Sequence, residues 1–285
     1  MEVDRASMTA EGAAIMRALH QNSSADERVL DDPIAKLLVD QNGDAYQARV
    51  SFLASLSVPV RSRLTSFVLR SRYAEDCLTD AFRLGLRQYV ILGAGLDTFA
   101  YRQPAWAHAL RVFEVDHPAT QKWKYAQLDK AAIKIPDNLT FVAVDFGRVS
   151  LQGGLSDARL DFAAPTFFSL LGVSQYLSIE ALDHTLAFIL KMPRSSEIVF
   201  SIVLPEDALP ADDAALAAEY ANRSAAVGEP WLTRIIPHRL VMSLREMGFS
   251  DVFHLTPTEA NARYFQGRRD GLSASLIEQM VRAVV

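Results

Sequence analysis

Apolar and polar positions follow one pattern up to about residue 86 and another beyond it. In the first part, apolar residues recur every three or four positions, which is the spacing of one helix face. Asp32 before Pro33 indicates a helix start, because aspartate caps free N–H groups and proline suits the first helical position. This pattern predicts a helical cap over 1–86, with helices within 9–20, 31–40, 43–56 and 61–86.

From Arg87 onward, short apolar runs alternate with amphipathic segments, which is typical of strand and helix units in a parallel sheet. The runs predict strands at 88–93, 110–116, 139–145, 165–171, 196–203 and 250–255. The segments between them predict helices at 97–101, 118–132, 179–190 and 238–247. Residues 280–285 fit either a last strand or a helix end.

An additional helix is expected at 206–227, within an insertion of about 206–236 after the fifth strand. Insertions at this position commonly cover a ligand crevice at the strand ends. The whole pattern predicts an α/β fold with helices on both faces of the sheet. We expect one domain over 1–285, with the core at 87–285.

Composition narrows the classes of partner. The net charge of −5 provides no basic field for a phosphate backbone, so nucleic acid is not expected. The single cysteine, Cys77, can form neither an internal disulfide nor a thiolate cluster, and no two histidines have a metal-ligand spacing. We expect no metal.

The start of the chain does not resemble a signal peptide and no apolar run could cross a bilayer, so a cytoplasmic protein without a membrane partner is expected.

The first strand of the predicted sheet leads into a glycine-containing turn. Gly93 and Gly95 let the backbone turn sharply and approach a ligand closely, and Asp97 can cap the following helix. A nucleotide-like ligand could bind there. A turn between strand and helix also requires glycine for structural reasons alone, so both interpretations remain open.

The second strand ends in Glu114 and Asp116, about twenty residues after the glycines, where a carboxylate can accept ribose hydroxyls. We expect one of these two acids to face solvent. Nicotinamide enzymes and methyltransferases both place an acid there. Thr98 stands where the dinucleotide motif has its third glycine, which argues against a pyrophosphate site.

The third strand ends in Asp145 and Phe146, which could contact an adenine, although a loop acid has the same pattern. Three successive strands with polar ends predict one crevice across their carboxyl ends.

The motifs LGAGLDTFAYR, FEVDHP, VDF, SRYAED and GRRDGL together resemble the leucine carboxyl methyltransferase-like family, in its bacterial S-adenosylmethionine-dependent branch. The resemblance extends over nearly the whole chain. It implies a Rossmann-like class I methyltransferase sheet and the cofactor S-adenosylmethionine. It also implies the cofactor contacts. Arg72 would bind the carboxylate, and Gly93, Gly95 and Asp97 would lie along the methionine part. Asp116 would bind the ribose, and Asp145 with Phe146 the adenine.

One position departs from the family. Relatives often carry a glutamate in the fourth-strand segment, where this chain has Leu171. The resemblance places Leu171 beside the sulfonium, and the nearby ring of Tyr176 could attract that cation.

The function that this resemblance implies is methyl transfer to a carboxylate or hydroxyl oxygen of a small molecule. A carboxylate is favoured, because it needs no general base and the motifs contain no convincing one. Arg102, Arg268 or Arg269 could hold an anionic acceptor, and Tyr176 and Arg102 are the candidates for a catalytic role. The alternatives are a protein carboxyl methyltransferase, a non-catalytic S-adenosylmethionine-binding protein and, less in keeping with Thr98, a nicotinamide oxidoreductase.

Overall fold

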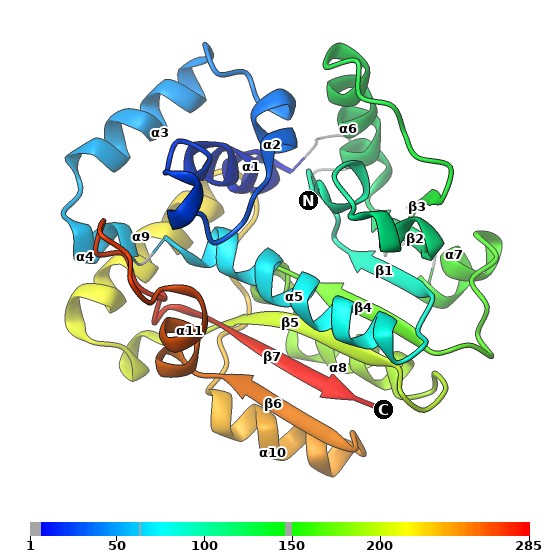
Figure 1. Cartoon of the computed structure of the whole chain (residues 1–285). Helices are drawn as coiled ribbons and strands as arrows, with labels where there is room; N and C mark the ends of the chain where they lie inside the picture. The colour runs from blue at the N-terminus through cyan, green and yellow to red at the C-terminus, as the bar shows by residue number, and fades with distance from the viewer. Residues whose placement is uncertain (1–6, 63, 146–149) are drawn as a thin grey trace.

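A twisted sheet forms the centre of the molecule (Figure 1). The computed structural model describes residues 7–62, 64–145 and 150–285, and Phe146 therefore lies outside the described residues. The seven strands follow the order β3-β2-β1-β4-β5-β7-β6. They are β1 (Gln88–Leu92), β2 (Arg111–Asp116), β3 (Leu139–Ala143), β4 (Thr166–Leu170), β5 (Glu197–Val203), β6 (Asp251–Leu255) and β7 (Glu278–Val284).

The first five strands are parallel, so their carboxyl ends meet at one edge of the sheet. Ile91 of β1 pairs with Glu114 of β2 on one side and with Ser169 of β4 on the other. The turn after β1 therefore lies between the end of β2 and the end of β4. This register brings the polar strand ends together.

Helices pack on both faces of the sheet, as the sequence predicts (Figure 1). Alternate residues of β1 point to opposite faces: Tyr89 and Ile91 belong to a core shared with α5, and Val90 and Leu92 to a core shared with α8 and α10. The helices are α1 (Met8–His20), α2 (Pro33–Leu38), α3 (Asp44–Ser55), α4 (Val58–Ser62), α5 (Ser66–Arg83), α6 (Pro118–Lys130), α7 (Leu151–Asp157), α8 (Ile179–Ile189), α9 (Ala211–Ala226), α10 (Pro237–Met247) and α11 (Pro257–Tyr264).

Most predicted elements are confirmed, and Asp32 caps α2 by accepting the Ala35 N–H at 3.1 Å. The helix predicted at 97–101 is wrong in kind, since only a three-residue 3₁₀ turn forms at Phe99–Tyr101. The Asp97 carboxylate accepts the Phe99 N–H at 2.8 Å, a local turn that competes with helix formation. The end of the chain is a strand, and β7 runs antiparallel between β5 and β6.

Candidate functional site

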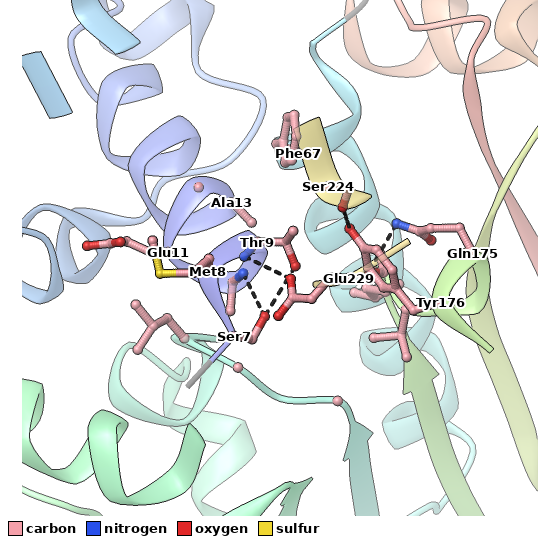
Figure 2. Close-up of a pocket in the computed structure, with 18 of the residues that line it drawn as sticks. Ser7, Met8, Thr9, Glu11, Ala13, Phe67, Gln175, Tyr176, Ser224 and Glu229 are labelled. Atoms are coloured by element: carbon pink, nitrogen blue, oxygen red, sulfur yellow. Dashed lines mark hydrogen bonds between the residues drawn. The ribbon is translucent and has the colours of Figure 1, made fainter. Parts of the chain in front are cut away.

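A cavity of about 920 Å³ opens at the carboxyl ends of the parallel strands. Its walls extend from Asp145 after β3, past the turns after β1 and β4, to Glu278 at the start of β7. Residues of α1, α3 and α9 complete its lining. Figure 2 shows Met8, Thr9 and Glu11 of α1 and Ser224 of α9 among them. The predicted crevice at the strand ends is therefore present, and the predicted inserted helix forms part of its cover.

The glycine turn lies directly on the cavity wall, where both glycines have positive φ angles, 68° at Gly93 and 47° at Gly95. A Cβ atom at Gly93 would lie 2.5 Å from the Val173 side chain, and one at Gly95 would lie 3.0 Å from Ala10. The first glycine lets the β4 loop approach, and the second lets α1 sit on the turn. These contacts account for glycine at both positions and leave backbone exposed to the cavity.

Asp116 joins this turn to the end of β2. Its Oδ2 accepts the Gly95 N–H and its Oδ1 accepts the His117 N–H, both at 2.6 Å. Burial raises the pKa of the Asp116 carboxyl above its usual value, and the two N–H donors oppose that rise. Each oxygen keeps a lone pair that can accept from a ligand.

Most of the sequence-predicted site residues converge on the cavity. Its lining includes Gly93, Gly95, Asp97, Asp116, Asp145, Leu171 and Tyr176. Leu171 is half-buried, and the Tyr176 hydroxyl accepts from Ser224 Oγ of α9 at 3.3 Å (Figure 2).

Arg72 is not on the cavity wall, which corrects the expectation that it lies beside the cofactor. Its guanidinium donates to Asp76 at 2.9 Å and to the Val29 carbonyl at 3.4 Å, in a separate surface depression. Residues two apart on a helix point in nearly opposite directions, so the neighbouring Arg70 is the one that reaches the cavity.

Arg70 is held on three sides. Its Nη1 lies 3.1 Å from Glu278 Oε1, the guanidinium carbon is 5.1 Å from the centre of the Phe67 ring, and a Cβ atom at Gly172 would overlap the guanidinium. Arg70 follows Phe67 by three residues and precedes Ala74 by four. The helix spacing could therefore have identified Arg70, whereas nothing in the sequence links it to Glu278, 208 residues away.

Arg102, a candidate catalytic residue, is also absent from the cavity wall. Its guanidinium makes a bidentate pair with Glu75, at 2.5 and 2.9 Å, and lies 3.3 Å from Asp32. Asp32 also accepts from Arg17 at 3.0 Å and from Thr98 Oγ1 at 2.7 Å. Burial would raise the pKa of Asp32, but Arg17 and Arg102 outweigh it and hold that pKa below its usual value. This network ties the glycine turn to α1, α2 and α5, which is a structural role.

The arginines of GRRDGL have structural contacts as well. Arg268 pairs with Asp270 at 2.5 Å and donates to the Glu27 carbonyl, and Arg269 pairs with Asp26 at 3.0 Å. Neither lies on the cavity wall. They hold the loop before β7 against the segment between α1 and α2.

Glu114 differs from expectation, because neither acid of β2 faces solvent. It is fully buried, with Oε2 2.6 Å from Lys124 Nζ of α6. Burial raises the pKa of Glu114 to about 7 even though Lys124 opposes the shift. Glu114 thus fastens α6 to the sheet behind the cavity.

Glu229, which sequence reasoning missed, connects the inserted segment to α1 across the cavity. Its Oε2 accepts the Thr9 N–H at 3.1 Å, in the first turn of a helix that Ser7 caps (Figure 2). A carboxylate at a helix N-terminus is stabilised by the helix dipole. This hydrogen bond joins α1 to the inserted segment, the two parts of the chain that cover the cavity.

Within the described part of the chain, no group of histidine, cysteine, aspartate and glutamate side chains could hold a metal ion. The helices of that part also include none with the length and apolarity that a membrane span requires.

A seven-stranded sheet with an antiparallel seventh strand, and a glycine turn at its ligand crevice, define the class I S-adenosylmethionine-dependent methyltransferases. The chain belongs to the leucine carboxyl methyltransferase family, whose sequence profile matches residues 10–190. It is 32% identical over 305 aligned residues to YktD of Bacillus subtilis (strain 168), which is named as an S-adenosyl-L-methionine-dependent methyltransferase, with 100% of this chain and 99% of that protein covered.

A Mycolicibacterium smegmatis protein named in the same way is 38% identical over 187 residues, covering 62% of this chain and 60% of that protein. In fold, the chain is similar to a crystal structure from Thermobifida fusca described as a methyltransferase. The TM-score is 0.59 at 17% identity, with 99% of this chain and 96% of that chain covered. S-adenosylmethionine is accordingly the cofactor of this methyltransferase.

Proposed function

We propose that the chain transfers the methyl group of S-adenosylmethionine to an oxygen of a small molecule, with a carboxylate as the preferred acceptor. When bound, the cofactor supplies an electrophilic methyl group on a sulfonium, together with a good leaving group. The residues of the chain then have to align the acceptor and exclude water.

The residues at the strand ends form a binding site that fits the cofactor. Asp145 after β3, Asp116 at the end of β2 and the glycine turn after β1 follow one another along the cavity wall. In the proposed orientation Asp145 contacts the adenine, Asp116 accepts from the ribose, and Gly93 and Gly95 lie along the methionine part. Asp97, at the end of the turn, supports this backbone through its bond to the Phe99 N–H.

The observation that carries the proposal is that the cavity also has aromatic walls. Phe52, Tyr220 and Trp231, from α3, α9 and the loop after α9, line it together with the strand-end residues. Arg49, also on its wall, lies over the Phe52 ring at 5.9 Å. Aromatic walls with a guanidinium suit an organic acid with an apolar body.

A carboxylate acceptor is favoured on chemical grounds. It attacks as an anion and needs no base, and its charge and that of the sulfonium cancel in the transition state, which a weakly polar pocket favours. Tyr176 and Leu171 both line the cavity, and an aromatic ring there can attract the sulfonium. The bond between Thr9 and Glu229 closes the cavity cover, which suits a small molecule better than a protein terminus.

A hydroxyl acceptor is the second candidate, and Glu229 is the observation that favours it. Its carboxylate lies on the cavity wall and could accept a proton from a phenol or alcohol.

The test is a screen of small carboxylic acids and phenols with radiolabelled S-adenosylmethionine. We expect an alkali-labile ester whose rate of formation changes little in the Glu229→Gln variant. An alkali-stable ether whose formation requires Glu229 would replace the carboxylate proposal by the hydroxyl one. Cofactor binding without transfer to any acceptor or to protein termini would favour the non-catalytic alternative.

A further inference from the structure

Two arginines from different helices lie over one aromatic ring on the cavity wall. Arg49 of α3 and Arg223 of α9 both line the cavity, and their guanidinium carbons lie 5.9 and 5.0 Å from the centre of the Phe52 ring. A Cβ atom at Gly12 of α1 would lie 3.6 Å from Arg49 Nη2. The two positive charges are therefore close to each other, beside α1.

Acidic side chains balance these charges only in part. Arg223 pairs with Glu219, one turn earlier on α9, at 2.5 Å, and both side chains are about half-exposed. No carboxylate pairs with Arg49 among the residues that the structure describes. Burial raises the pKa of the neighbouring Tyr220 hydroxyl, and the charges of Arg49 and Arg223 oppose that rise. The group of Arg49, Arg223 and Glu219 thus keeps a net positive charge.

The cavity wall also holds a buried donor that has no partner within the described part of the chain. This donor is the Nε1–H group of Trp231, a residue of the cavity lining. Trp231 and Tyr220 pack against the same apolar cluster, which consists of Val203, Leu216, Ala217 and Ile277. Buried N–H groups in native proteins almost always have an acceptor, and a bound carboxylate supplies one.

A reacting carboxylate is a poor ligand for the two guanidiniums. Its negative charge disappears as the methyl group is transferred, so guanidiniums bound to it would stabilise the ground state more than the transition state. Their charges would also repel the cationic sulfonium. An anionic group at the other end of the acceptor keeps its charge throughout, so its binding raises affinity without lowering the rate.

We infer that Arg49 and Arg223 bind a second anionic group of the acceptor, and that the preferred acceptors are dicarboxylic acids. This inference rests on the proposed function. The far carboxylate contacts the two arginines, and the aromatic walls contact the apolar chain between the carboxylates. An oxygen of the near carboxylate forms a bond to the methyl carbon while the carbon–sulfur bond breaks and leaves its electron pair on sulfur. The products are a monoester with one negative charge and S-adenosylhomocysteine, and no proton is transferred.

The experiment measures acceptor binding by calorimetry in a chain saturated with S-adenosylhomocysteine, so that no transfer occurs. The probes are straight-chain dicarboxylic acids of six, eight and ten carbons, each compared with the monocarboxylic acid of the same length. At one length or more, the unaltered chain should bind the diacid about 10- to 100-fold more tightly, the range expected for hydrogen bonds to a charged group.

The variants Arg49→Gln and Arg223→Gln should each lower this preference about 3- to 10-fold, because solvent screens a half-exposed charge pair. The double variant should lose it. Arg49→Lys, which keeps the charge, should retain most of it. The comparison of diacid with monoacid in the unaltered chain needs no variant, so it remains informative if a variant folds poorly.

The matched control is Arg72→Gln. Arg72 also pairs with an acid one turn away, Asp76, is 45% exposed and lies 5.9 Å from the centre of the Tyr264 ring, but it is outside the cavity lining. This variant should keep the preference for diacids. Equal binding of diacid and monoacid at every length would overturn the inference, as would a preference that persists in the double variant.

Turnover with radiolabelled S-adenosylmethionine separates this inference from the proposed function. For a diacid, Arg49→Gln and Arg223→Gln should raise KM and leave kcat nearly unchanged. An equal fall in kcat for monoacids and diacids would place the guanidiniums at the reacting oxygen and overturn the inference. A preference for diacids in binding, without transfer to any acid, would count against the proposed acceptor chemistry alone.

Discussion

The Asp116 carboxylate at the end of β2 stabilises the fold and also forms part of the proposed cofactor-binding site. Asp116 accepts the N–H groups of Gly95 and His117, which fixes the turn that the cofactor would approach. Its pKa is raised by burial, so ionised Asp116 depends on these donors and on any further hydrogen bond from a ligand. A ribose with two hydroxyls supplies such hydrogen bonds.

We expect Asp116→Asn to weaken S-adenosylhomocysteine binding by about 1–3 kcal/mol, because an amide cannot accept at both former oxygen positions. Calorimetry measures the change. Asp161→Asn is the control, since Asp161 makes a similar bond, to the Ala163 N–H at 2.9 Å, in an exposed turn away from the cavity. If the folded Asp116→Asn protein binds S-adenosylhomocysteine with unchanged affinity, Asp116 is not part of the cofactor-binding site.

The junction of β2 and α6 contains a buried acid and a buried amine as well as apolar packing. Glu114 of β2 and Lys124 of α6 are both 1% exposed or less, and Glu114 Oε1 has no hydrogen-bond partner within the described residues. A carboxylate in this setting is costly to ionise. The junction of β2 and α6 should therefore respond to pH in the neutral range.

The free energy of unfolding should carry a contribution from Glu114 that decreases as the pH rises. The folded pKa of about 7 lies above the 4.5 of an ordinary glutamate, so the stabilisation is complete below pH 4.5 and is lost as the pH rises through about 7. Denaturant unfolding between these pH values measures the slope, which Glu114→Gln should flatten. The same slope in both proteins would show that Glu114 stays ionised. The control is Glu180→Gln, which replaces an exposed glutamate and should leave this slope unchanged.

Across the whole molecule, the helical cap and the sheet core share one set of contacts. α5 of the cap packs on β4, β5 and β7, and the Asp32 network joins α1 and α2 to the glycine turn of the core. The Arg17 guanidinium reaches the Leu96 carbonyl at 2.5 Å. Neither part could bury its apolar surface without the other, so we expect the cap and the core to unfold together.

We predict one cooperative unfolding transition and a loss of about 3–5 kcal/mol in Asp32→Asn, because Arg17 and Arg102 would lose the carboxylate that they share. Circular dichroism, which follows both parts, and the fluorescence of Trp106, measured in a background with Trp123→Phe and Trp231→Phe, should report the same midpoint. The adjacent Asp31 pairs with Arg28 at the surface, and Asp31→Asn should cost no more than about 1 kcal/mol. Separate transitions for the two probes in Asp32→Asn would show that the cap unfolds independently.

The sequence alone determined most elements and the general position of the site. Apolar runs define the parallel strands because both faces of the sheet are buried, and Gly93, Gly95 and Asp116 were identifiable because a sharp turn and a strand-end acid are local features. Seven of the predicted site residues line the cavity for this reason. The sequence predicted a helix after Asp97, where only a short 3₁₀ turn forms, because the Asp97 side chain accepts the Phe99 N–H two residues later.

Only the tertiary structure decided which charged side chains face the cavity. Arg70 and Arg72 are equivalent in composition, and the direction of α5 relative to the sheet places the first on the wall and the second at the surface. Arg102 was a plausible anion ligand until Asp32 and Glu75, from two other helical segments, were found to neutralise it. The pairing of Arg70 with Glu278 depends on the insertion of β7 between β5 and β6, a contact across 208 residues that no local pattern encodes.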